Sequence, residues 1–144
     1  KLAQACEHLF GTTHFLHPHF SYVLLSTCNR TEVYFHSSDP AETHTYLINS
    51  LRVEIEEEFE HRIYSYFGSD CFFHLARVTA GIDSALIGET EIQGQVKRAY
   101  ETASQCRPLD SSLHYLFQKS LKIGKNIRAG GQWTTSALSI EEAV

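Results

Sequence analysis

The sequence predicts an α+β fold, with strands and helices in the first half and helices alone in the second. Residues 20–26 and 31–37 form two runs rich in Tyr, Val, Leu and Phe, a composition that favours strands. From Ser69 onward apolar residues recur at helical spacing instead. The chain has 144 residues, of which 42% are hydrophobic, which is enough for one domain or two small lobes sharing a core.

The first elements follow from local signals. Residues 1–10 predict the end of a helix that Gly11 stops. The two strands, 20–26 and 31–37, are separated by a few polar residues, which is hairpin spacing. Asn29 tolerates the left-handed conformation that tight hairpin turns use. A helix followed by a β-hairpin is therefore expected.

A second helix and a further strand complete the first half. Asp39 is a cap and Pro40 a first-turn proline, so a helix is expected from there to about Phe59. The run "RIYSYFG" then predicts a strand that ends at Gly68. This order matches a ferredoxin-like βαββαβ sandwich whose first strand is expected to be missing from the chain.

Three helices are expected in the second half. Ser69 and Asp70 are expected to cap the first, which runs to about Ala80 and is broken by Gly81. The second ends before Pro108, and the third begins at the cap Asp110. The apolar faces of the second and third comprise Ile92, Val96, Ala99, Tyr100 and Ala103, and Leu113, Leu116, Phe117, Leu121 and Ile127.

Glycines mark two further features of this half. Gly124 predicts a close helix contact, because an unused glycine costs about 1 kcal/mol within a helix. Gly130 and Gly131 form a joint, after which "TTSALSIEEAV" starts another helix. We expect three parts in the chain. Residues 1–68 form the sandwich that carries the candidate nucleophile, and residues 69–130 form the helical part of the same domain. Residues 131–144 are the start of a linker helix.

Composition narrows the function classes. A net charge of -5 and a pI near 6.0 argue against a broad nucleic-acid footprint, although not against a local patch. No apolar run approaches the roughly 18 residues of a membrane span, so no membrane association is expected. The four cysteines include no CxxC pair, which favours free thiols in a reducing, cytoplasmic setting.

Histidines near the N-terminus raise the question of a metal. His14, His17 and His19 follow Cys6 and His8 within a short stretch. Their spacing matches no common zinc pattern. No metal is expected.

The candidate nucleophile is Cys28, in the polar run "STCNRTE" between the two strands. A reactive thiol needs nearby positive charge and exposure. Arg30 lies two residues on, where an extended chain places it on the same side, to activate the thiol or to clamp a carboxylate. Thr27 and Asn29 offer donors and acceptors for a carbonyl. The residues alone leave two interpretations open: a nucleophile on a rigid mount, or a turn with an incidental cysteine.

Candidate bases are less distinctive. His74 lies on a predicted helix between Phe73 and Leu75, where a packed core or boundary histidine is the alternative to a catalyst. His36 and His61 lie nearer the strands. The polar stretch 81–97 is either a capped helix junction or one wall of a polar pocket. It contains neither GxGxxG nor a P-loop.

Two segments resemble one known family. "LLSTCNRTEVY", followed by "HLARVTAGIDSALIGETEIQGQVKRAY", is similar in sequence and in order to the N-terminal catalytic domain of glutamyl-tRNA reductase. The tail "TTSALSIEEAV" resembles the entry into the family's long linking helix. The resemblance covers most of the chain.

The resemblance implies a reaction. The family reduces the glutamate of glutamyl-tRNA(Glu) to glutamate-1-semialdehyde with NADPH, in tetrapyrrole and haem synthesis. Carried over, Cys28 attacks the aminoacyl ester to form a thioester, His74 manages protons or orients groups, and Arg30 holds the glutamate carboxylate. Glu32 matches a family position that is either functional or structural. The remaining substrate-binding residues that the resemblance implies are Thr27, Asn29, Ser84, Glu89, Glu91 and Gln95.

The resemblance also implies what lies outside this chain. The NADPH domain and the C-terminal dimerisation domain are absent, so the full-length enzyme is expected to bind NADPH and form a homodimer. This fragment is expected to bind no cofactor, to be monomeric, and to be limited to acyl transfer or ester hydrolysis. A further family partner is the glutamate-1-semialdehyde aminotransferase. The alternatives are a stand-alone cysteine esterase using Cys28 and His74, and a non-enzymatic interaction module.

Overall fold

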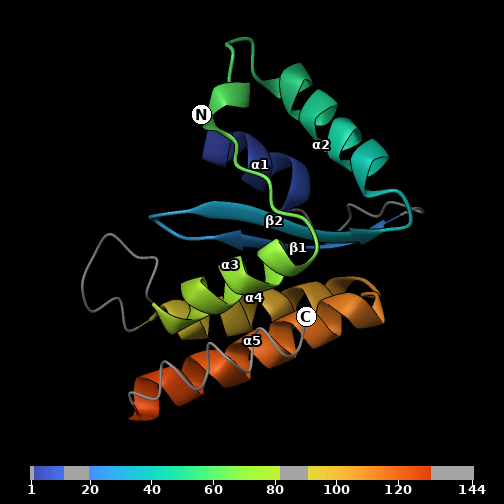
Figure 1. The fold of residues 1–144 in the computed structure, drawn as a ribbon. Helices are drawn as coiled ribbons and strands as arrows, with labels where there is room; N and C mark the ends of the chain where they lie inside the picture. Colours follow the sequence, from blue (N-terminus) through green and yellow to red (C-terminus); the bar gives the residue numbers. More distant parts are fainter. Residues whose placement is uncertain (1, 12–19, 82–90, 131–144) are drawn as a thin grey trace. The chain divides into compact units, whose positions relative to one another are not determined.

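The computed structural model describes residues 2–11, 20–81 and 91–130. An α+β fold is confirmed within these ranges (Figure 1). Its elements are α1 (Leu2–Phe10), β1 (Phe20–Ser26), β2 (Thr31–Ser37), α2 (Pro40–Glu54), a 3₁₀ turn (Glu60–Arg62), α3 (Ser69–Ala80), α4 (Ile92–Cys106) and α5 (Ser111–Gly130).

The described parts group into two compact units. The first unit contains residues 1–64 and 99–113, and the second contains 65–98 and 114–144. The segment 99–113 thus packs with the hairpin half of the chain, although it follows the polar stretch in sequence. The sequence-based division at residue 68 remains a prediction about the family's domains.

The first unit is built on the β1–β2 hairpin. The strands pair antiparallel in the register from Phe20 with Ser37 to Ser26 with Thr31. Both α1 and α2 contact the sheet and lie on the same side of it (Figure 1). Because side chains alternate along a strand, every second residue faces these helices. The strand residues that pack there are Phe20, Tyr22, Leu24, Val33 and Phe35.

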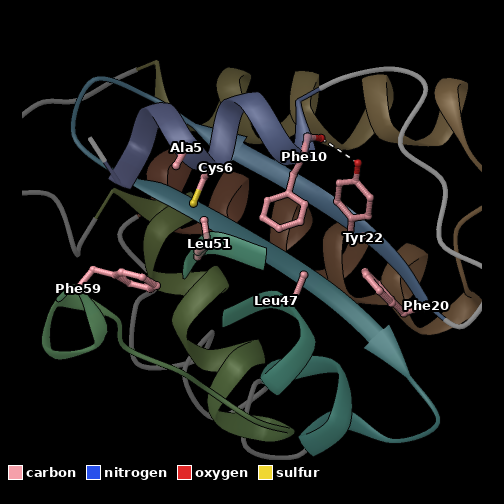
Figure 2. Close-up of a cluster of buried hydrophobic side chains, with 8 residues drawn as sticks. All are labelled: Ala5, Cys6, Phe10, Phe20, Tyr22, Leu47, Leu51 and Phe59. Carbon is pink, nitrogen blue, oxygen red and sulfur yellow. Dashed lines mark hydrogen bonds between the residues drawn. The ribbon is translucent and has the colours of Figure 1, made fainter. Parts of the chain in front are cut away.

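A hydrophobic core fills the space between the hairpin and the two helices (Figure 2). Tyr22 is almost completely buried in it, and its hydroxyl donates a 2.8 Å hydrogen bond to the Phe10 carbonyl at the end of α1. The Phe10 and Tyr22 rings meet edge to face, with their centroids 5.8 Å apart. Burial raises the pKa of Tyr22, so its hydroxyl stays protonated and remains a donor. The buried members are Ala5, Cys6, Phe10, Phe20, Tyr22, Leu47, Leu51 and Phe59.

The segment after α4 is attached to β1 by polar contacts. The Arg107 guanidinium carbon lies 3.9 Å from the centroid of the Tyr22 ring, and its Nη1 donates to the Tyr22 carbonyl at 3.2 Å. The Asp110 amide donates to the Ser21 hydroxyl at 3.0 Å. Buried hydrogen bonds to a charged donor contribute about 1.5–3 kcal/mol each. These contacts explain why 99–113 belongs to the first unit.

Two sequence predictions in the first half are wrong. α2 ends at Glu54 rather than near Phe59, because Ile55 has an extended backbone that ends the hydrogen-bond ladder. The run "RIYSYFG" forms no strand, since residues 63–67 have no regular structure in the described chain. Its aromatic content gives a high strand propensity, but Tyr64 is 81% exposed, so no neighbouring strand or core selects that conformation.

The predicted helix boundaries are otherwise largely confirmed. Asp39 caps α2 by accepting the Glu42 amide at 3.1 Å. Asp110 accepts the Ser112 amide at 2.8 Å at the start of α5. Gly81 ends α3 with a φ of 75°, in the left-handed region. The start of α3 differs from expectation, because its N-cap is Gly68 and no side chain caps it.

In the second unit α3 packs against α5. Phe72, Ala76 and Ile123 are buried together. A Cβ at Gly124 would lie 2.7 Å from Cγ2 of Thr79 and 3.1 Å from its backbone carbonyl group. The close helix contact that the sequence predicted at Gly124 is therefore confirmed. Within the ranges that the structure describes, no helix has the length and apolar character to cross a membrane.

We expect Gly124→Ala to lower the free energy of unfolding by about 1–3 kcal/mol, because the added methyl group overpacks the Thr79 backbone. Urea denaturation followed by circular dichroism measures it. The matched control is Gly94→Ala in α4, where the nearest atom is the flexible Arg98 Nη1 at 3.3 Å. Helix propensity should make that variant up to about 1 kcal/mol more stable. Equal stability of the two variants would contradict the close contact.

Candidate active site

The hairpin tip carrying Cys28 is a closed four-residue turn. The Thr27 amide donates to the Arg30 carbonyl at 2.8 Å. The Thr27 hydroxyl oxygen accepts the amides of Asn29 and Arg30, each at 3.2 Å. Cys28 and Asn29 are exposed at the tip. A side-chain acceptor thus holds the backbone that presents the thiol.

Asn29 does not adopt the left-handed conformation that it could tolerate. No non-glycine residue in the described ranges has a positive φ. The reason is the loop length, since four residues lie between the paired positions Ser26 and Thr31. Such loops are commonly built on a type I turn, which needs no positive φ.

A contact from α1 braces the end of β1. The hydroxyl of Ser26, the residue before the turn, donates a short hydrogen bond to a carboxylate oxygen of Glu7. Ser26 and Thr27 together therefore hold both the strand end and the turn that follows it. This geometry presents Cys28 to solvent on a fixed support.

Arg30 lies beside two polar residues of β2. Its Nη1 is 3.7 Å from Oε2 of Glu32. The Tyr34 hydroxyl donates a 2.8 Å hydrogen bond to Oε1 of the same carboxylate. The side chains of Arg30 and Glu32 are only 14% and 18% exposed. The site thus combines an exposed thiol with a largely shielded guanidinium two residues away.

The four cysteines differ in accessibility. All are free thiols, and Cys28 is the exposed one. Cys6 is buried in the core of the first unit, where burial, and then the nearby Glu7 charge, raise the pKa of its thiol. Cys71 and Cys106 are half-buried. Accessibility therefore favours the cysteine that the sequence analysis singled out.

The predicted site residues belong to two different compact units of the structure. Thr27, Cys28, Asn29 and Arg30 come together on the hairpin tip of the first unit. His74, Glu91 and Gln95 belong to the second unit. Ser84 and Glu89 lie outside the described residues.

His74 has an aromatic neighbour within the second unit. Its ring stacks on Tyr66 with a centroid distance of 4.4 Å and an interplanar angle of 13°. Tyr66 is 47% exposed. The stack fixes the plane of the imidazole. A role of His74 as the base for Cys28 stays a prediction.

Two of the predicted substrate-binding residues, Glu91 and Gln95, lie at the start of α4. Glu91 is exposed, and its carbonyl accepts the Gln95 amide at 2.9 Å. The side-chain oxygen of Gln95 is buried without a hydrogen-bond donor among the described residues. Buried acceptors without a donor are uncommon, and a functional role is one of the explanations for such a group. The described residues contain no cluster of potential metal ligands, and His14, His17 and His19 fall outside them.

Sequence reasoning missed two residues that contact the hairpin-tip region and one that contacts His74 in the second unit. Glu7 and Tyr34 act through contacts with Ser26 and Glu32, and Tyr66 through its stack on His74. Only Tyr34 carried a usable signal, because it lies two residues after Glu32 on the same side of a predicted strand. Glu7 and Tyr66 have no such link in sequence.

Comparison with known proteins decides the family. The sequence model that describes the N-terminal domain of glutamyl-tRNAGlu reductase matches residues 1–130. The chain belongs to this family. The resemblance seen in "LLSTCNRTEVY" and in the later segment is thereby confirmed.

Curated glutamyl-tRNA reductases align along nearly the whole domain. The enzyme of Chlamydia pneumoniae is 41% identical over 138 residues, which cover 96% of this chain and 39% of the relative. That of Pseudoalteromonas translucida is 35% identical over 144 residues, covering 99% of this chain and 34% of the relative. The chain thus spans between a third and two-fifths of the length of these relatives.

A solved structure supports the fold. Glutamyl-tRNA reductase from Methanopyrus kandleri superposes with a TM-score of 0.62 at 29% identity. The match covers 88% of this chain and 27% of that chain. The α+β architecture of the domain is therefore shared with an enzyme of the same family.

We expect alkylation by iodoacetamide near neutral pH to modify Cys28 first and Cys6 last. The thiolate is the reactive form, so exposure favours Cys28, whereas burial and a raised pKa protect Cys6. Peptide mass spectrometry over a time course gives the order. In denaturant the four rates should converge. If Cys6 were modified as fast as Cys28 in the folded domain, the thiol of Cys28 would be no more accessible than that of Cys6.

We expect Thr27→Val to speed amide hydrogen exchange at Asn29 and Arg30 about fivefold, since each loses an acceptor worth about 1 kcal/mol. Exchange followed by NMR at these two amides measures it. Thr27→Ser keeps the hydroxyl and should exchange like the unmodified domain. Unchanged exchange in Thr27→Val would show that the hydroxyl does not hold the turn.

Proposed function

We propose that this chain is the acyl-transfer domain of an NADPH-dependent glutamyl-tRNA reductase, with Cys28 as its nucleophile. The observation that carries the proposal is the braced hairpin tip, which holds an exposed thiol two residues from a shielded guanidinium. Membership of the family supplies the substrate class.

The reaction follows from the chemistry of a thiolate. Its sulfur attacks the carbonyl carbon of the ester that joins glutamate to the tRNA ribose. A carbon–sulfur bond forms, the ester carbon–oxygen bond breaks, and the ribose oxygen leaves with a proton. The thioester keeps the glutamyl group activated towards hydride.

The remaining candidates take roles around that step. Arg30 pairs with the glutamate side-chain carboxylate, since a guanidinium matches a carboxylate in a bidentate manner. Thr27 and Asn29 border the acyl group from the turn. His74 protonates the leaving oxygen or orients it. Further residues proposed to border the substrate are Ser84, Glu89, Glu91 and Gln95, of which Gln95 presents a buried acceptor.

Reduction requires parts of the enzyme beyond this domain. The sequence contains no GxGxxG unit, and the described sheet is a two-stranded antiparallel hairpin rather than a βαβ unit. NADPH, which supplies hydride to the thioester, is therefore assigned to the remainder of the full-length enzyme. A homodimer, a contact with the glutamate-1-semialdehyde aminotransferase and a cytoplasmic location belong to the same proposal. Similarity to reductases along almost the whole chain disfavours a stand-alone cysteine esterase.

We expect Cys28→Ser in the full-length enzyme to abolish acyl transfer, because serine lacks the thiolate that attacks the ester. The measurement incubates the enzyme with tRNA(Glu) carrying labelled glutamate, without NADPH, and counts acid-stable label on the protein. The unmodified enzyme should acquire label that hydroxylamine releases, as a thioester does.

Cys71→Ser and Cys106→Ser are the matched controls, since both thiols are half-buried and neither belongs to the hairpin-tip segment 27–30. Both variants should be labelled like the unmodified enzyme. Label retained on Cys28→Ser protein would refute the assignment of the nucleophile. Label on none of the proteins would refute acyl transfer altogether.

A further inference from the structure

Arg30, Glu32 and Tyr34 form a row on one side of the β2 segment. They are alternate residues, so their side chains project from the same face. The Tyr34 hydroxyl donates to Oε1 of Glu32 at 2.8 Å, and Oε2 of Glu32 lies 3.7 Å from Nη1 of Arg30. Tyr34 is 4% exposed, and the side chains of Glu32 and Arg30 are 18% and 14% exposed. The row therefore connects an almost fully buried tyrosine to the proposed active site.

The two carboxylate oxygens of Glu32, in the middle of this row, contact different partners. An ionised carboxylate only accepts hydrogen bonds, and here one oxygen accepts from Tyr34 while the other faces the guanidinium. A hydrogen bond to one oxygen fixes the rotation of the whole carboxylate. The buried ring of Tyr34 has little freedom to move. The orientation of Glu32 therefore depends on the Tyr34 hydroxyl.

Orientation matters because the guanidinium is planar. Its donors form a rigid fork, and a second carboxylate can pair with it in a bidentate manner only if the plane is correctly turned. The negative charge of Glu32 also offsets part of the attraction that Arg30 exerts on any anion. A ligand must then match the fork in geometry as well as in charge.

We propose that Tyr34 and Glu32 are positioning residues that set the plane of the Arg30 guanidinium, and thereby select glutamate over its neutral isostere glutamine on the same tRNA. The inference rests on the proposed function of Arg30 and Cys28. It assigns the choice of amino acid to a three-residue row rather than to Arg30 alone.

The test measures acyl transfer to the full-length enzyme, without NADPH, from tRNA(Glu) charged with either glutamate or glutamine. Tyr34→Phe keeps the buried ring and removes only the hydroxyl. We expect it to lower the ratio of the two transfer rates about tenfold, within the range for a hydrogen bond to a charged group.

Tyr22→Phe is the matched control. It also removes a buried tyrosine hydroxyl that donates at 2.8 Å, from the neighbouring strand, but its acceptor is the Phe10 carbonyl. It should lower the stability of the domain and leave the ratio unchanged. An unchanged ratio in Tyr34→Phe, or an equal fall in Tyr22→Phe, would overturn the inference. Absence of transfer from glutamyl-tRNA to the unmodified enzyme would refute the proposed function itself and remove the basis of the inference.

Discussion

The register of the β1–β2 hairpin determines which side chains can act together at its tip. The antiparallel pairs from Phe20 with Ser37 to Ser26 with Thr31 place Tyr22 and Phe35 towards α1 and α2. A shift of one residue would turn every side chain of a strand to the opposite face. Glu32 and Tyr34 would then face the hydrophobic core, where a carboxylate has no partner. The packing of the core and the polar row at the tip are two consequences of one alignment.

Tyr22 links that alignment to the rest of the first unit. Its hydroxyl reaches the end of α1, its ring lies under the Arg107 guanidinium, and its carbonyl accepts from the same arginine. A cation over an aromatic face gains more when water is excluded. A single side chain thus joins three segments that are far apart in the sequence. The hairpin is therefore in contact with both the N-terminal helix α1 and the segment after α4.

Local sequence signals were sufficient to predict the elements whose limits depend on neighbouring residues in the chain. The limits of β1 and β2, the cap at Asp39 and the break at Gly81 were all predicted correctly. The run from Arg62 to Gly68 was mistaken for a strand, because strand formation requires a partner and propensity does not supply one. The exposed, free Cys28 follows from its polar neighbours. The bracing by Glu7 does not, because it depends on where α1 packs.

The site shows the same division. The motif around Cys28 identified the family, since its residues are adjacent in sequence. The contact of Tyr34 with Glu32 required the actual strand geometry and a hydroxyl at the right distance. The stack of Tyr66 on His74 required a loop conformation that no periodicity encodes. Candidate catalytic residues that share a sequence motif are thus easier to recognise than the residues that contact them.

The interleaving of the two units has a consequence for biosynthesis. Both α4 and α5 begin in one unit and end in the other, and the first unit needs residues 99–113. A ribosome adds about 5–20 residues per second, so Arg107 and Asp110 emerge several seconds after the hairpin that they hold. During that interval the nascent hairpin lacks the guanidinium that will cover Tyr22. The unit that carries Cys28 is therefore completed late in translation, although the residues of the hairpin tip are among the first to be made.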